Sequence, residues 1–87
     1  MSIRPNPFNP STTIEIMVIR QTPVELSVYN TVGQNIRTLV ASTLSPGSHI
    51  VRWDGRNGAG DPVSSGVYIA RLKTGDGVTT CRMTLVR

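Results

Sequence analysis

The chain has 87 residues, of which 38% are hydrophobic and 16% are charged, and its net charge is +4. This length and composition are typical of one small folded domain and exclude a long disordered chain. No apolar run approaches the roughly 18 residues that a membrane-spanning helix needs. The nine basic residues are spread from Arg4 to Arg87 without a cluster, so the charge indicates a solvated surface and not a nucleic-acid interface.

Residues 1–11 carry three of the six prolines. Proline donates no hydrogen bond to a strand ladder and keeps the preceding residue extended, so we expect an extended proline-rich lead-in and not a central strand. Phe8 is the one aromatic residue of this segment and is expected to pack against the domain. The segment lacks the basic and apolar regions of a signal peptide, which suggests that Met1 begins a fragment of a longer parent protein.

Apolar and polar residues alternate through most of the remaining chain, residues 12–87. This period of two is typical of half-buried strands, and no segment shows the helical spacing of apolar residues. Turn-forming residues such as Ser45-Pro46-Gly47 and Gly75-Asp76-Gly77 separate the runs. The pattern predicts strands at 14–18, 24–28, 35–41, 49–53, 67–73 and 78–86.

A single flat sheet of such strands would leave its apolar face exposed, so two sheets are expected to pack face to face. The predicted fold class is therefore all-β, an immunoglobulin-like antiparallel β-sandwich of about seven strands. Trp53 should be the largest core side chain. By strand parity, the inward-facing residues are Ile14, Ile16, Val18, Leu26, Val28, Val51, Trp53, Tyr68, Ala70, Leu72, Cys81, Met83 and Leu85.

The residues that carry chemistry in enzymes are few and scattered. His49 is the only histidine, and it lies five residues before Asp54 on one extended run, so the two side chains should face opposite sides and form no Ser-His-Asp triad. Cys81 is the only cysteine and is expected to be a small buried thiol. We therefore predict that the domain is not an enzyme, with no catalytic, cofactor-binding or metal-binding residue.

The stretch from Trp53 to Asp61 is the richest in polar residues. Asp54, Asn57 and Asp61 could offer oxygen ligands to calcium, but the alternating acidic positions and closing glutamate of an EF-hand loop are absent. A structural turn, in which Asp54 and Asp61 accept backbone N–H bonds, is favoured. Weak calcium binding stays open as an alternative.

Several short motifs occur in an order that resembles a known family. They are Asn6-Pro7-Phe8-Asn9-Pro10-Ser11-Thr12-Thr13-Ile14, Val28-Tyr29-Asn30-Thr31-Val32-Gly33, Trp53-Asp54-Gly55, Ser65-Gly66-Val67-Tyr68 and Arg82-Met83-Thr84-Leu85-Val86-Arg87. Together they resemble the C-terminal sorting domain, type A, of proteins exported by the type IX secretion system. From Tyr29 onward the pattern is also similar to the immunoglobulin-like domain of flagellar hook-capping proteins.

The resemblance implies that residues 12–87 form a sorting domain that carries an upstream cargo protein through the periplasm to the cell surface or the medium. The implied partners are proteins, namely the outer-membrane translocation machinery and a sortase-like peptidase. Arg82 takes the place of the family's usual lysine, which keeps the charge but not the shape. The implied recognition residues, with basic side chains facing outward, are Arg82, Thr84, Val86 and Arg87, and the expected structural residues are Phe8, Trp53, Asp54, Gly66 and Tyr68.

Other roles remain open at this point. The edge strands of a small sandwich can offer unpaired backbone groups to another chain, which suits an interaction module. A flagellar hook-cap module, a carbohydrate-binding module and a spacer beside a secreted enzyme are the alternatives. A carbohydrate binder should expose two or three aromatic rings on one face, whereas Phe8, Tyr29, Trp53 and Tyr68 are few and mostly expected inside.

Overall fold

The computed structural model describes residues 1–87 and contains strands and turns. Its seven strands form two antiparallel sheets, which confirms the predicted all-β sandwich. No segment forms a helix that is long and apolar enough to span a membrane. The strands are β1 (Ser2–Arg4), β2 (Thr12–Val18), β3 (Thr22–Asn30), β4 (Asn35–Leu44), β5 (Gly47–Trp53), β6 (Gly66–Thr74) and β7 (Gly77–Leu85).

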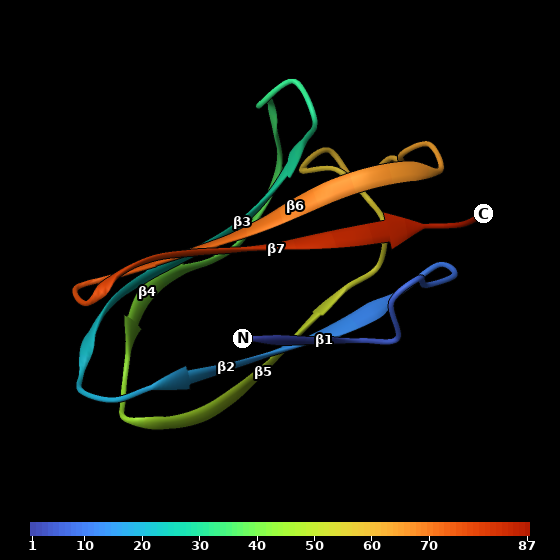
Figure 1. Ribbon diagram of the computed structural model, residues 1–87. Helices are drawn as coiled ribbons and strands as arrows, with labels where there is room; N and C mark the ends of the chain where they lie inside the picture. The colour runs from blue at the N-terminus through green and yellow to red at the C-terminus, as the bar shows by residue number, and fades with distance from the viewer.

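The two sheets lie in two layers (Figure 1). The smaller sheet has the order β1-β2-β5, and the larger sheet has the order β4-β3-β6-β7. The hairpins β3–β4 and β6–β7 stay within the larger sheet, whereas the chain crosses between the sheets after β2, β4 and β5. As a result, β1 and the C-terminal strand β7 are both edge strands.

The core between the layers follows the predicted alternation. In β2, for example, Ile14, Ile16 and Val18 are buried while Met17 is exposed. Two of the predicted inward residues, Val51 and Cys81, are only half-buried. Both lie on edge strands, β5 and β7, where no neighbouring strand covers one flank of the side chain.

Strand β1 is the element that the sequence pattern does not reveal. Ile3 pairs with Ile14 in register and is buried. The prolines begin at residue 5, directly after the strand, so they do not interrupt its ladder. After the prolines the chain brings Phe8 into the core with 2% of its surface exposed, as expected for a residue that fixes the lead-in to the domain.

Three aromatic rings form the centre of the core. The Trp53 ring centroid lies 5.5 Å from that of Phe8 at an interplanar angle of 58°, and 5.3 Å from that of Tyr68 at 70°. These tilted and edge-to-face arrangements suit the quadrupoles of the rings. The cluster joins the lead-in, the end of β5 and the start of β6 through the fully buried Trp53.

We expect Trp53→Ala to lower the free energy of unfolding by about 3–5 kcal/mol, because truncation of a buried aromatic leaves a cavity that its neighbours cannot fill. Denaturant unfolding of the variant and the parent protein measures this change. Val32→Ala is a suitable control, since Val32 is 77% exposed and its truncation should cost less than about 0.5 kcal/mol. A loss below about 1 kcal/mol for Trp53→Ala would contradict its central position.

Candidate recognition surface

Strand β7 pairs with β6 on one side and leaves its other side at the edge of the larger sheet. Its pairing begins with Gly77 opposite Thr74, across a two-residue turn. Backbone groups of an antiparallel strand alternate between its two sides, so every second residue of β7 directs its N–H and C=O away from β6. These edge-facing residues are Val78, Thr80, Arg82 and Thr84.

Residues 6–8, which we call the edge cap, occupy the C-terminal half of this edge and run parallel to β7. The Phe8 N–H donates to the Thr84 carbonyl at 2.9 Å, and the Val86 N–H donates to the Phe8 carbonyl at 2.9 Å. Asn6 Nδ2 donates to the Arg82 carbonyl at 2.9 Å, and Asn6 Oδ1 accepts the Thr84 N–H at 3.0 Å. The Asn6 side chain thus takes the place of the main-chain N–H and C=O that residue 6 would present to Arg82 and Thr84 in a regular parallel ladder.

Arg87 fixes the end of the chain. Its Nε donates to the Val63 carbonyl at 2.6 Å, one Nη donates to the Gly55 carbonyl at 2.5 Å, and its backbone N–H donates to Ser65 Oγ at 2.9 Å. Gly55 has a φ of +74°, and a Cβ at this residue would come within 2.8 Å of both the Arg87 guanidinium and the Pro10 carbonyl. Only glycine therefore suits this turn.

The four residues proposed for recognition differ in their exposure and in their contacts. Arg82 and Val86 are exposed and Thr84 is half-buried. Arg87 is exposed as well, but its guanidinium is engaged by the loop after β5, so the expected outward basic side chain is instead an anchor. The backbone of Thr84 and Val86 is covered by the edge cap, so Arg82 is the one member that combines an exposed position with a free charged group.

In the turn from Trp53 to Asp61, Asp54 Oδ1 and Asn57 Oδ1 accept hydrogen bonds from N–H donors. Asp54 Oδ1 accepts from Arg37 Nη1 at 2.9 Å and from the Arg56 N–H at 3.2 Å. Asn57 Oδ1 accepts the N–H groups of Ala59 and Asp61 at 3.0 Å each. The turn is therefore built by Asp54 and Asn57 through their side chains and by Asp61, which accepts the Asn57 N–H at 2.9 Å through its main-chain carbonyl. In addition, Trp53 Nε1 donates to the Arg56 carbonyl at 2.9 Å.

The remaining residues considered for chemistry or structure have local partners. His49 Nε2 lies 2.7 Å from the Ser45 carbonyl oxygen, so the ring contacts the β4–β5 connection and not Asp54. The Tyr68 hydroxyl donates to the Ser64 carbonyl at 2.7 Å. Burial raises the pKa of Tyr68 above its ordinary value of 10.0, and the nearby Arg87 charge opposes this rise. Gly66 begins β6 opposite Leu85.

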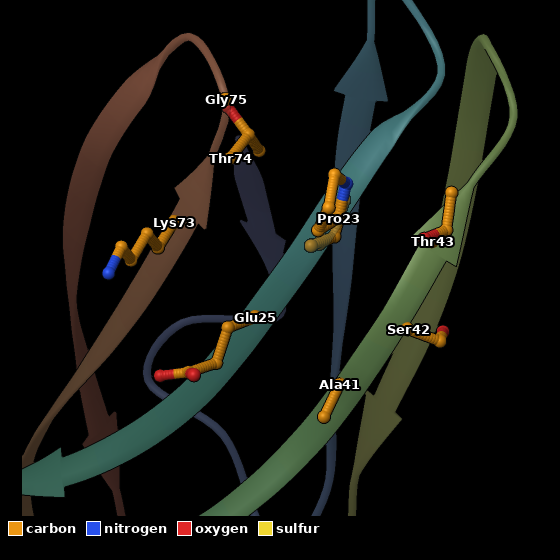
Figure 2. A pocket seen from close by; sticks show the side chains of 9 residues that line it. Pro23, Glu25, Ala41, Ser42, Thr43, Lys73, Thr74 and Gly75 are labelled. Carbon is orange, nitrogen blue, oxygen red and sulfur yellow. The ribbon is translucent and has the colours of Figure 1, made fainter.

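An open depression on the outer face of the larger sheet, about 480 Å³ in volume, lies over β3, β4 and β6. Figure 2 shows Glu25 on β3 between Lys73 on β6 and Ala41 on β4. Glu25 and Lys73 are cross-strand neighbours, and such opposite charges favour the register. The lining has no aromatic ring, so the hollow offers no stacking platform for a sugar.

The sequence reasoning missed Asn6 and the edge cap. The hydrogen bonds of Asn6 reach residues 76 and 78 positions away, and no local pattern encodes such a contact. The one available signal is the composition of Asn6-Pro7-Phe8: an amide side chain and an aromatic anchor flank a residue that cannot pair through its backbone.

Comparisons with known proteins agree with this fold. A model of the FlgD Ig-like domain family matches residues 10–77. A solved structure of PorZ, an essential surface component of the type-IX secretion system of Porphyromonas gingivalis, is similar with a TM-score of 0.70 at 22% identity, and the match covers 99% of this chain and 11% of the PorZ chain. At this identity the likeness to PorZ concerns the fold alone. No curated protein matches the chain.

The raised pKa of Tyr68 predicts a pH dependence of stability. The unfolded chain loses the tyrosine proton near pH 10, whereas the folded domain keeps it to higher pH, so stability falls as the pH rises above about 10. Tyr68→Phe should remove this part of the fall and cost about 1 kcal/mol at neutral pH through loss of the bond to Ser64. Unfolding curves between pH 7 and 11 test both effects. Parallel profiles for the variant and the parent protein would contradict the assignment.

Asn6→Ala should lower the free energy of unfolding by about 1 kcal/mol, because both of its hydrogen bonds to β7 are lost and water partly replaces them. Amide hydrogen exchange at Thr84 should also become faster. Asn9→Ala is the matched control, as Asn9 is exposed and makes no hydrogen bond in the structure. Equal effects of the two substitutions, with Thr84 protection unchanged, would show that the Asn6 side chain does not hold the cap.

Proposed function

The chain belongs to the FlgD Ig-like domain family, and from this premise we propose that it is a non-catalytic recognition module that directs an attached cargo protein through the type IX secretion system. In this role the domain is the C-terminal sorting signal of its parent protein. The cargo crosses the periplasm and reaches the cell surface or the medium. The partners are the outer-membrane translocation machinery and a sortase-like peptidase.

One observation carries the proposal: the C-terminal residues are held in a single conformation at the surface. The edge cap binds residues 82–86 through four hydrogen bonds, and Arg87 anchors the end of the chain. Between these fixed points Arg82 projects from an edge strand with an exposed side chain. A receptor that reads a folded terminus would meet a preorganised surface, which lowers the entropic cost of binding.

Two further points support the sorting role. The motifs from Asn6 to Arg87 resemble sorting domains in their order, and the structure assigns several of them to the contacts that build this terminus. In addition, the fold is similar to part of PorZ, which is a surface component of that secretion system. Both points are compatible with a module that works through a surface and not through an active site.

A flagellar hook-cap-like module is the second candidate, and the family match itself favours it. In that case the domain contributes to an extracellular assembly and carries no export information. The two candidates differ in one measurable property, the export of a fused reporter.

Fusion of this domain to the C-terminus of a periplasmic reporter should send the reporter to the surface or the medium of a host that has type IX machinery. Arg82→Ser should reduce this export, because it removes the exposed charge and leaves the core and the cap in place. The matched control is Arg52→Ser, which removes an exposed arginine from β5 of the other sheet. Cell fractionation of the reporter gives the result.

The folded state of each variant is verified by its unfolding midpoint. Deletion of residues 82–87 should abolish export, but it also removes the buried Met83 and Leu85. Lost export can therefore result from unfolding, so only unaltered export of the deletion is informative. Unaltered export of this deletion, or equal export of the Arg82 and Arg52 variants, contradicts recognition through the terminal strand. Retention of the parent fusion in the periplasm favours the hook-cap-like role.

A further inference from the structure

We propose that the open half of the β7 edge, residues 78–82, binds an extended acidic segment of another polypeptide as an added strand. This inference goes beyond the sorting role, because it concerns the part of β7 that precedes the capped terminus and holds for either candidate function. It assigns a binding mode and a partner chemistry to a surface of this domain.

The backbone of the open half is available. Val78 and Thr80 direct their N–H and C=O groups to the edge, by the same alternation that directs Thr84 to the cap. The Arg82 N–H faces the same way, although the Arg82 carbonyl is already bound by Asn6. Exposed groups of this kind form a template for one more strand.

The domain itself demonstrates the binding mode. The edge cap is a short extended segment that pairs with residues 82–86 through backbone and amide groups. Upstream of the cap the chain leaves this edge, because Ser2–Arg4 pair with β2 in the other sheet. The cap therefore covers one half of the edge and leaves the other half without a partner from this chain.

A hollow of mixed polar and apolar lining adjoins the open half, and Asp76, which is paired with Arg20, is among its lining residues. It has a volume of about 300 Å³ and lies between the β1–β2 layer and the start of β7. Two of its lining residues outside β7 are large, apolar and exposed, namely Met17 at 64% and Ile19 at 79%. Side chains of an added strand alternate between the two faces, so every second one can enter this hollow, where an aliphatic group removes apolar surface from water.

The other face next to the open half is basic. Arg71 and Lys73 on β6 are the cross-strand partners of Thr80 and Val78, and Arg82 lies on β7 itself. Side chains of an added strand that point to this face lie directly beside Arg82, with Arg71 and Lys73 one strand farther away. Complementarity favours acidic residues at these alternate positions.

The same charges disfavour pairing of two copies of this chain along β7. Such a pairing would join two basic faces, with Arg82 of each copy on the paired strands, and like charges across adjacent strands repel. The chain has nine basic and five acidic residues, so it offers no acidic surplus to offset this. The occupant is accordingly a different polypeptide, in which aliphatic and acidic residues alternate.

The test uses the full 87-residue chain and a terminally blocked heptapeptide in which valine alternates with glutamate. Titration followed by amide NMR should shift the signals of residues 78–82, and hydrogen exchange of the Val78 and Thr80 amides should slow. Methylation of one central backbone nitrogen of the peptide should weaken binding about threefold to tenfold, through loss of a hydrogen bond. This comparison leaves the protein unchanged, so folding does not affect it.

Two protein variants test the charge argument. Arg82→Glu should weaken binding of the acidic peptide by about threefold or more, because an attraction becomes a repulsion. Arg52→Glu, the same reversal on the other sheet, should leave the affinity unchanged. A heptapeptide that alternates valine with lysine should bind more weakly to the parent protein than the acidic peptide does.

Any of four results would overturn the proposal. They are absence of shifts at residues 78–82 with millimolar peptide, shifts confined to the hollow over β3, β4 and β6, equal binding of the methylated peptide, and self-association of the chain through β7 in sedimentation experiments without peptide. Failure of the reporter export described above has no bearing on this outcome, since the titration needs no secretion machinery.

Discussion

The contact of Trp53 with Phe8 and Tyr68 is the constraint on which the rest of the structure depends. Trp53 comes from the smaller sheet, Tyr68 from the larger sheet, and Phe8 from the segment that precedes β2. Because Phe8 is held in the core by this contact, its backbone lies against β7, and Asn6 is brought within reach of Arg82 and Thr84. The hydrophobic cluster thus positions the side-chain amide of Asn6 against β7 at the surface. Without the aromatic anchor, only the four hydrogen bonds of the cap would hold this proline-rich segment against β7.

Much of the fold could be predicted from the sequence, because alternation of apolar residues is a local signal that survives in β2, β3, β6 and β7. The prediction weakened at the edges, where Val51 and Cys81 are only half covered. It failed to reveal β1, whose three residues are too few to show a period and precede a run of prolines. The candidate site was harder to predict from the sequence, since Asn6 and Arg87 form hydrogen bonds with partners that are distant in sequence. Side-chain type alone does not show whether an arginine is a free charge or an anchor.

The two halves of the β7 edge avoid unwanted strand pairing in different ways. An exposed edge strand invites unwanted pairing, and the cap removes this risk for the C-terminal half by filling the edge with the chain's own residues. The N-terminal half is left unpaired, but Arg82 lies at its end and Arg71 and Lys73 lie on the neighbouring strand β6. These charges repel a second copy while attracting an acidic partner. The sorting role and the added strand therefore use different parts of the same edge. One depends on a fixed terminus with an exposed arginine, and the other on free backbone groups upstream of it.

The parallel course of the cap and β7 has a mechanical consequence. Because the cap and β7 run parallel, a pull on the N-terminal side of the cap and on the C-terminal end of β7 slides residues 6–8 and β7 past each other along the strand axis. The hydrogen bonds between Phe8, Asn6 and the terminal strand are then loaded together in shear and do not open one after another. Resistance to such a pull is set by the unfolding rate under force and not by equilibrium stability. Residues 6–8, near the start of the chain, thereby hold its C-terminal strand in place. Their hydrogen bonds to β7 would have to break before tension could draw β7 out of the sheet.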